Sequence, residues 1–160
     1  MLEEPLLSAC VPVIRAAFQT IADLGLTERN APTSPAFMTL ERLRQARDRG
    51  VRMFALLVGE GAVATPAGFV ALERSPRPGV FYLERLAVLT ALRHRGMGRA
   101  LMDHAFAEAR AAGAERISIG IVDEHVALKR WYLDYGFVVT GTKRFERLPF
   151  AVCFMEKPVG

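Results

Sequence analysis

Apolar side chains recur at helical spacing in two segments of the first third of the chain. Residues 13–26 place them at every third or fourth position up to Gly25, and the more polar residues 39–50 end at Gly50. This periodicity, followed by glycine, is typical of an α-helix and its C-terminal end. We therefore expect two helices, joined by a proline-containing loop over residues 27–37.

The middle of the chain holds three short apolar runs that are separated by turn residues. Residues 52–60 and 67–75 flank a glycine-containing turn and predict a hairpin, and residues 77–89 predict a third, largely buried strand. Beyond them the pattern alternates between helix and strand. Its segments are a helix from Gly98 to Gly113, a strand over residues 116–122, a helix over residues 124–135 and short strands near residues 137–140 and 150–156.

This order of elements predicts a single domain of the α/β (α+β) class over residues 1–160. The sheet should start as an antiparallel meander and have parallel strands in its centre, with about four helices around it. The composition agrees with a globular domain, since the chain is 51% hydrophobic and 24% charged, with a formal net charge of +4.

Charge and cysteine content narrow the class of protein further. The sequence has no block of five or more like charges, which argues against a nucleic-acid partner. No apolar run reaches the ~18 residues of a membrane span, and the acidic N-terminus is unlike a signal peptide. Cys10 and Cys153 give no disulfide or metal framework. We expect a cytoplasmic protein with no membrane partner, no nucleic-acid partner and no metal.

Positive charge and glycine gather where the helix at Gly98 is expected to begin. Residues 93–98 carry two arginines, a histidine and two glycines, and none of them is a typical side-chain cap. A helix start has unpaired N–H groups and a partial positive charge, and glycine lets an anion approach the backbone. The segment predicts a phosphate or pyrophosphate site; the alternative is an ordinary arginine-rich, solvated loop.

Two common phosphate-binding motifs do not fit this segment. A P-loop requires Gly-x-x-x-x-Gly-Lys-Ser/Thr, and no such run occurs in the sequence. A dinucleotide fingerprint needs a third glycine where Leu101 stands and an acidic residue where Arg116 and Ile117 stand. The glycine pair therefore favours neither a P-loop nucleotide site nor a nucleotide-binding oxidoreductase.

Arg93, Gly96 and Gly98 instead match Arg/Gln-x-x-Gly-x-Gly/Ala after an apolar strand. Residues 125–137 are similar to a second motif, Asn-x-x-Ala-x-x-x-Tyr-x-x-x-Gly-Phe, with Tyr132 and the final Gly-Phe in register. With both motifs in this order, the chain resembles the GNAT superfamily of N-acetyltransferases. The resemblance implies a GNAT-like mixed sheet whose parallel central strands are splayed around acetyl-coenzyme A, the co-substrate.

The resemblance also implies which residues bind this co-substrate. The strand backbone would pair with pantetheine and hold the thioester oxygen near Val88, and the glycine loop would hold the pyrophosphate. Four positions depart from the family pattern, namely His125 for Asn, Leu128 for a small residue, His94 for Gly and Thr90 for Pro. The implied contacts are Leu86, Ala87, Val88, Arg93, His94, Arg95, Gly96, Met97, Gly98, Arg99, Ala100, His125, Leu128 and Tyr132.

Two residues are candidates for moving protons. By the resemblance, Tyr132 would protonate the departing thiolate of coenzyme A; the alternative is an aromatic that only packs beside its neighbours. Glu84 is the candidate base for the amine, because a charged residue in an apolar strand is costly to bury without a partner. A structural ion pair with Arg85 or Arg116 is the alternative, and strand alternation predicts that Arg85 faces away from Glu84.

Three other residues have competing interpretations. His125 is expected to contact the cofactor, to act as an alternative base, or to cap a helix. Gly120 would permit a close backbone approach to the ligand or would mark a bulge. Cys153 with His125 could imitate a thiol nucleophile pair, but a buried cysteine in an apolar strand is favoured.

The acceptor pocket should come from the first two helices, their loop and residues 141–150. Phe37, Met38, Phe145 and Phe150 would make it apolar, with mixed charge nearby. We expect an N-acetyltransferase that moves acetyl from acetyl-coenzyme A to a primary amine, on a small molecule or a peptide, by direct attack. The alternative is a non-catalytic coenzyme A-binding or regulatory module on the same fold, and a homodimer is one option for either.

Overall fold

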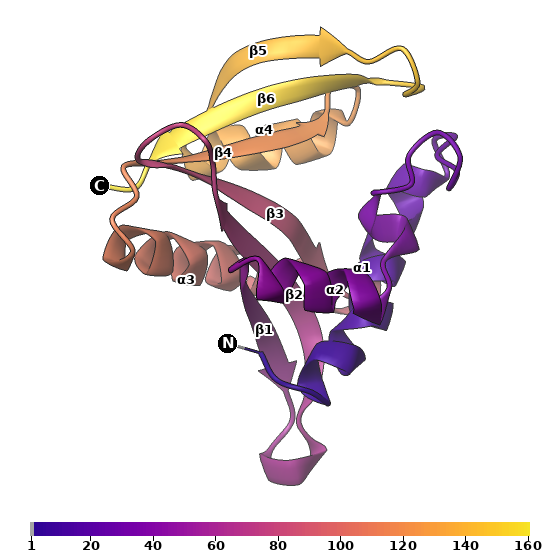
Figure 1. Ribbon diagram of the computed structural model, residues 1–160, viewed down its shortest axis with the longest axis vertical. Helices are drawn as coiled ribbons and strands as arrows, with labels where there is room; N and C mark the ends of the chain where they lie inside the picture. The colour runs from indigo at the N-terminus through magenta and orange to yellow at the C-terminus, as the bar shows by residue number, and fades with distance from the viewer. Residues whose placement is uncertain (1) are drawn as a thin grey trace.

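The computed structural model of the protein describes residues 2–160. Within this range a six-stranded sheet is flanked by four α-helices (Figure 1), which confirms the predicted α/β (α+β) class. No helix of residues 2–160 is long and apolar enough to cross a membrane. The helices are α1 (Leu6–Ala22), α2 (Leu40–Asp48), α3 (Met97–Ala111) and α4 (Val126–Tyr135). The strands are β1 (Arg52–Val58), β2 (Thr65–Arg74), β3 (Val80–Val88), β4 (Arg116–Val122), β5 (Val138–Arg144) and β6 (Ala151–Pro158).

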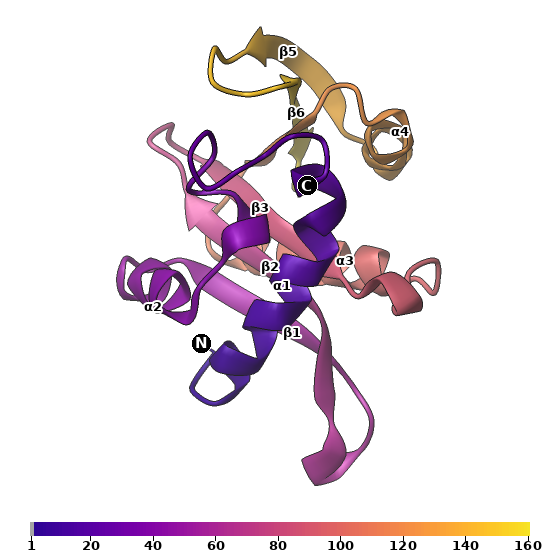
Figure 2. The same ribbon diagram turned by 90° about the vertical axis from the view of Figure 1, so that its right-hand side faces the viewer.

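β2 shows why the sheet is covered on both faces. Residues 67–72 are all buried, and successive side chains point to opposite sides of the strand. Phe69 and Ala71 pack with α1 and α2, whereas Val70 and Leu72 pack with α3 and α4. A continuous apolar run is what a strand needs when both of its faces are buried. The helices accordingly lie in two layers, one on each side of the sheet (Figures 1 and 2).

α1 begins at Leu6, ahead of the predicted start at residue 13. Pro12 lies inside the helix on its exposed side, where a locally weakened backbone is tolerated, and Leu7 extends the buried face toward the N-terminus. At the other end the helix stops before Leu24. That residue was part of the predicted apolar stripe, but it is exposed because the chain has already left the helix.

β3 and β4 are the parallel pair, and they diverge. Residues 80–82 pair with residues 116–118, but β3 continues to Val88 and β4 to Val122 without further pairing between them. The strand order β1-β2-β3-β4-β6-β5 confirms an antiparallel meander followed by parallel, splayed central strands. β6 continues the sheet antiparallel to β4.

β3 contains a bulge at Arg85. Phe69 pairs with Ala87 but Ala71 pairs with Glu84, so β3 has one residue more than β2 between these pairs. Arg85 has a φ of 57°, in the left-handed region that side chains rarely adopt. The extra residue interrupts the two-residue period of the strand. The prediction that Arg85 faces away from Glu84 is therefore wrong, since Arg85 Nη1 lies 3.6 Å from Glu84 Oε2.

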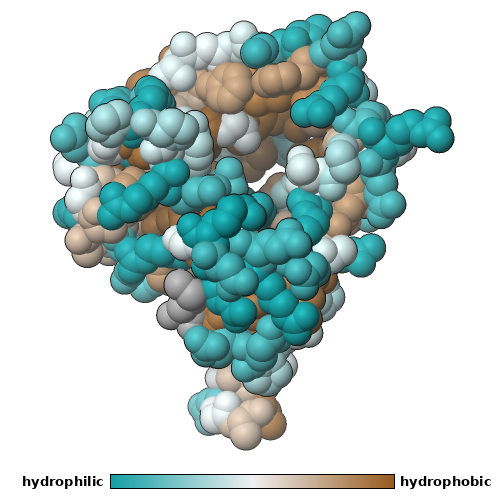
Figure 3. All heavy atoms as spheres, in the orientation of Figure 1, coloured by the Kyte–Doolittle hydropathy of each residue, from teal (hydrophilic) through white to brown (hydrophobic). Residues whose placement is uncertain are grey.

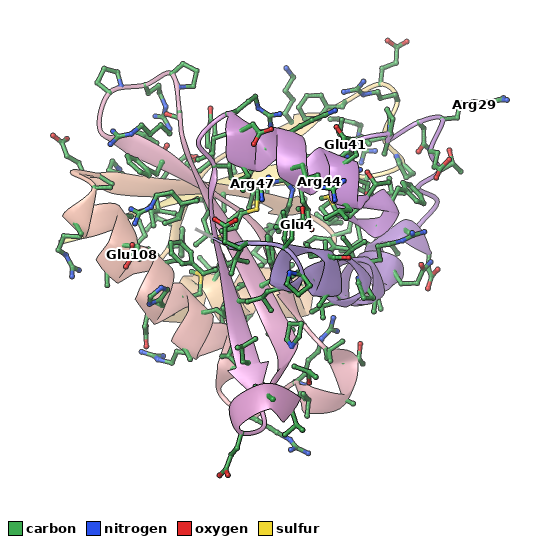
Figure 4. The ribbon with its side chains drawn as sticks, turned by 60° about the horizontal axis from the view of Figure 1, so that its bottom comes forward. Glu4, Arg29, Glu41, Arg44, Arg47 and Glu108 are labelled. Carbon is green, nitrogen blue, oxygen red and sulfur yellow. The ribbon has the colours of Figure 1, made fainter. Side chains whose placement is uncertain are left out.

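Ion pairs join the outer helices to their neighbours. Arg44 of α2 lies between Glu4, at 2.8 Å, and Glu41, at 3.9 Å (Figure 4). Glu108 of α3 pairs with Arg52 of β1, the sheet strand beside it. Exposed ion pairs of this kind contribute little to stability. The packing of the apolar faces is therefore what holds the helices on the sheet.

Candidate active site

A cavity of about 1000 Å³ occupies the divergence of β3 and β4. Its walls come from both strands, from α1 and the loop after it, from the starts of α3 and α4, and from the loop between β5 and β6. Figure 3 shows this face of the molecule hollowed, with hydrophobic side chains inside the hollow. A cavity of this size, formed where parallel strands separate, is a typical place for a ligand.

The start of α3 forms one end of the cavity. Gly96 is the N-cap residue, with a φ of 78°, and no side chain of residues 2–160 caps this helix. A Cβ added at Gly98 would lie 3.5 Å from the Trp131 ring and 3.9 Å from the Val88 side chain. Because Met97 and both glycines line the cavity, unpaired first-turn N–H groups are available there to an anion.

Arg93 has a contact that the sequence does not indicate. Its Nε donates a hydrogen bond to the Val88 carbonyl at 3.3 Å, and its Nη2 donates to the Ala17 carbonyl at 3.1 Å. The guanidinium thus connects the end of β3 to α1, across the cavity wall. Because these two donors are used by backbone carbonyls, Arg93 helps to hold β3 and α1 in place around the cavity.

Most of the expected cofactor contacts lie on the cavity wall. They are Leu86, Val88, Arg93, His94, Gly96, Met97, Gly98, Arg99, His125, Leu128 and Tyr132. Ala87, Arg95 and Ala100 are not among the lining residues. Ala87 faces the other side of β3 from its neighbours and is buried against α1 and α2, and the other two residues are exposed.

Tyr132 reaches the cavity from α4. Its ring packs edge-on against Trp131 and Phe137, with centroids 5.0 and 5.5 Å apart, and the residue is only 5% exposed. Burial raises the pKa of the Tyr132 phenol above its usual value, so the phenol is protonated at neutral pH. Tyr132 therefore packs in the apolar core and also lines the cavity.

Glu84 lines the same cavity from β3 and is partly buried. Burial raises the pKa of the Glu84 carboxyl above its usual value, and this effect outweighs the lowering by the positive charge of Arg85. Arg116 pairs instead with Glu156, at 3.3 Å. The alternative of a Glu84–Arg116 ion pair is therefore wrong, and the partner of Glu84 is Arg85.

His125 is the N-cap residue of α4. Its Nδ1 accepts a hydrogen bond from the Leu128 backbone N–H at 3.2 Å, and the residue also lines the cavity. This confirms the helix-capping interpretation. A neutral imidazole whose Nδ1 is occupied in this way has Nε2 as its donor.

Loss of this cap should lower stability without stopping the fold. His125→Ala is expected to reduce the free energy of unfolding by about 1 kcal/mol, because an N–H of the first turn loses its acceptor. His125→Asn should recover most of that loss, since asparagine is a favoured cap. Urea unfolding of the three proteins measures this, and equal losses in both variants would contradict the capping role.

Gly120 lies on the cavity wall, whereas Cys153 lies in the core. Gly120 lines the cavity from β4, and it pairs with Phe154 of β6 with no register shift, so the bulge interpretation is wrong. Cys153 is fully buried and does not line the cavity, which confirms that it is an apolar core residue. Among the described residues 2–160, no group of three or more metal-ligating side chains is found.

The other end of the cavity is formed by α1, the α1–α2 loop and the β5–β6 loop. Phe150 lies there, as expected. Phe37, Met38 and Phe145 do not line it; Met38 is fully buried beneath α1 and α2, and the Phe145 ring packs against the Lys143 ammonium. The expected contribution of α1 and its loop is made by apolar residues that the sequence analysis did not single out, namely Ala17, Phe18, Ile21, Leu26, Ala31 and Pro35.

Two further lining residues escaped prediction. Trp131 stands beside Gly98, and the only sequence signal for it is its place directly before Tyr132. Arg85 lines the cavity because of the bulge in β3, which strand alternation does not reveal.

The sequence and the fold both resemble those of known proteins. The model of the acetyltransferase (GNAT) family matches residues 18–137. No curated protein sequence matches the chain.

Three solved structures illustrate the likeness of the fold. A GNAT-family acetyltransferase from Staphylococcus aureus has 15% identity and a TM-score of 0.74, over 99% of this chain and 96% of that one. PaiA N-acetyltransferase from Thermoplasma acidophilum, in complex with coenzyme A, has 17% identity and a TM-score of 0.73, over 98% and 95%. Ribosomal-protein-alanine N-acetyltransferase from Brucella melitensis has 20% identity and a TM-score of 0.67, over 94% of each chain.

Proposed function

The chain belongs to the GNAT family of acetyltransferases, and we propose that it transfers acetyl from acetyl-coenzyme A to the nitrogen of a primary amine. One observation carries the proposal. A single cavity joins an uncapped helix start, a partly buried carboxylate with a raised pKa and a buried phenol with a raised pKa. These are an anion site, a base and an acid, which is the set of groups that acyl transfer to an amine needs.

The donor would lie between β3 and β4. The N–H groups of residues 96–98 would hold its pyrophosphate, and the backbone at Leu86 and Val88 would pair with pantetheine. Support for this fit comes from the strand divergence, the uncapped helix and the space at Gly98. His125 and Leu128 would contact the donor from α4, since both line the cavity.

The chemistry that bound acetyl-coenzyme A supplies is an acyl group on a thiol leaving group. Glu84 would take a proton from the substrate ammonium, which frees the nitrogen lone pair. The new bond joins that nitrogen to the acyl carbon, and the bond to sulfur breaks. Tyr132 would give its proton to the sulfur, and the nitrogen would lose its second proton to solvent as the amide forms, from which the Tyr132 phenolate regains a proton. An N–H near Val88 would stabilise the acyl oxygen as it gains negative charge.

A side chain at Gly98 should obstruct the donor site. Gly98→Leu is expected to weaken binding of coenzyme A by at least about tenfold, or about 1.4 kcal/mol, because the side chain would extend between the helix start and Trp131. Isothermal titration calorimetry with coenzyme A measures the loss. Gly141→Leu on β5 is the matched control, since a Cβ there meets nothing within 4 Å and the position is outside the cavity. Equal affinity in the two variants would contradict the proposed site.

The same titration on the unaltered chain tests the donor half of the proposal. We expect saturable, one-to-one binding of coenzyme A by the folded protein. A folded protein that gives no heat of binding with either coenzyme A or acetyl-coenzyme A would overturn the proposed function.

A further inference from the structure

Arg85 lines the cavity, paired with Glu84, and one nitrogen of its guanidinium lacks a hydrogen bond. Its Nη1 is the one buried side-chain nitrogen or oxygen atom in residues 2–160 with no hydrogen-bond partner. The side chain is only 16% exposed, and the 3.6 Å to Glu84 Oε2 is too long for a hydrogen bond. Leaving a buried charged donor without an acceptor is costly. The residue also lines the cavity, where an anionic ligand would stabilise its positive charge.

The backbone holds Arg85 in this position. The bulge in β3 and the left-handed φ of 57° bring its side chain beside Glu84 on the cavity wall. A left-handed backbone at a non-glycine residue is itself unfavourable and is found preferentially at ligand sites. The strand therefore presents a carboxylate and a guanidinium next to each other, on consecutive residues that face the same space.

Glu84 is the carboxylate paired with Arg85, and a second cation lies nearby. Arg42 of α2 is close enough that the positive charge of Arg85 helps burial to lower the pKa of its guanidinium. The donors of Arg42 are used by the carbonyls of Thr33, Ser34 and Phe37, so that this side chain fixes the loop that lines the cavity. A second cation near Arg85 strengthens the local attraction for an anion.

Apolar side chains form much of the cavity wall that α1, the loop after it and the β5–β6 loop contribute, beside the polar side chains of Thr20, Asn30, Thr33, Ser34 and Arg147. Phe18 and Ile21 of α1, Leu26 of the following loop and Phe150 line it. An acceptor that fits here therefore has an apolar group as well as charged ends, because apolar surface gains free energy when it leaves water.

We propose that Arg85 binds the carboxylate of the acceptor, which is a free α-amino acid with an apolar side chain. This inference rests on the proposed function. The ammonium of the amino acid would lie at Glu84 and its carboxylate at Arg85, so the adjacent opposite charges of the zwitterion meet adjacent opposite charges of the protein. A guanidinium matches a carboxylate with two parallel hydrogen bonds, and Arg85 lines the cavity in which the carboxylate would lie.

Matched acceptors test the inference. Thiol release from acetyl-coenzyme A is measured with L-phenylalanine, L-leucine and the amide of each, so that only the carboxylate differs within a pair. We expect kcat/KM to be at least about tenfold higher for the free acids, the size of effect that a charged hydrogen bond gives. In Arg85→Gln this preference should disappear through a higher KM for the acids, with the amides little changed.

Two variants control for folding and for general charge. Arg85→Lys retains the charge without the paired donors and should recover only part of the preference. Arg147→Gln removes an exposed arginine from the same cavity, at the β5–β6 loop, and should leave the preference intact. Titration of L-phenylalanine into each protein with coenzyme A present gives a binding readout that does not depend on turnover.

The outcomes separate the two proposals. Equal use of acids and amides, or an Arg147→Gln loss as large as that of Arg85→Gln, overturns the inference and leaves N-acetylation intact. Thiol release with none of the four acceptors also overturns the inference. The proposed function itself fails only if a broad panel of other primary amines gives no release either, in a protein that binds coenzyme A.

Discussion

Glu84→Gln is expected to lower kcat/KM for amine acetylation by about 10²–10³-fold, the range of a lost general base. Glutamine has the shape of glutamate but does not take a proton from an ammonium. The partly buried carboxylate beside Arg85 on the cavity wall is the group to which we assign this proton. Steady-state thiol release at saturating acetyl-coenzyme A measures the loss.

The pH dependence of the acetylation rate tests whether Glu84 is the base. Burial raises the pKa of the Glu84 carboxyl, so the rate should fall in acid at a pH above the usual carboxyl range, where the base becomes protonated. The Glu84→Gln variant should lack this limb. An unchanged acid limb in the variant would show that another group, such as His125 or a water, takes the proton.

Glu84→Gln should lose activity without losing thermal stability. A carboxyl whose pKa is raised by folding contributes stability below its unfolded pKa, and loses that contribution as the pH rises through the folded pKa. At neutral pH the ionised Glu84 is therefore a cost to folding, and glutamine removes it. The melting temperature of Glu84→Gln at neutral pH should be equal to or above that of the unaltered protein.

Tyr132→Phe is expected to lower kcat by about 10²-fold, at the lower end of general-acid effects, because a thiolate is already a reasonable leaving group. The phenylalanine ring retains the packing against Trp131 and Phe137, so the fold should be unaffected. Affinity for coenzyme A by calorimetry should also be unchanged. A variant with full kcat would contradict the acid role and leave Tyr132 as a packing residue.

Local pattern was sufficient to predict most of the fold. The continuous apolar run of β2 and the glycine that follows α2 are properties of short segments, and the local pattern detects them. The start of α1 was missed because a proline inside a helix is unfavourable in isolation, whereas Leu7 and Cys10 on the buried face stabilise the preceding turn.

The site was predicted less completely, because parts of it depend on contacts between distant segments. Gly96, Gly98 and Tyr132 could be assigned to it from motifs, and all three line the cavity. The hydrogen bond from Arg93 to the Ala17 carbonyl joins residues that are 76 positions apart in the sequence. No pattern near either residue indicates this contact.

The bulge at Arg85 shows a second limit of prediction. Alternation assumes one residue per step, and a single inserted residue reverses the predicted face of its neighbours. The expectations of one domain, a cytoplasmic location and a homodimer stay predictions.

The most direct measurement of the central claim follows both products of one reaction. The protein is incubated with acetyl-coenzyme A and L-phenylalanine, free thiol is measured, and mass spectrometry locates the acetyl group. We predict equal amounts of thiol and N-acetylated product, at a rate that Glu84→Gln reduces strongly. Thiol release that is independent of the amine would contradict the account, as would no release with L-phenylalanine or with any of a panel of other primary amines, from a protein that binds coenzyme A.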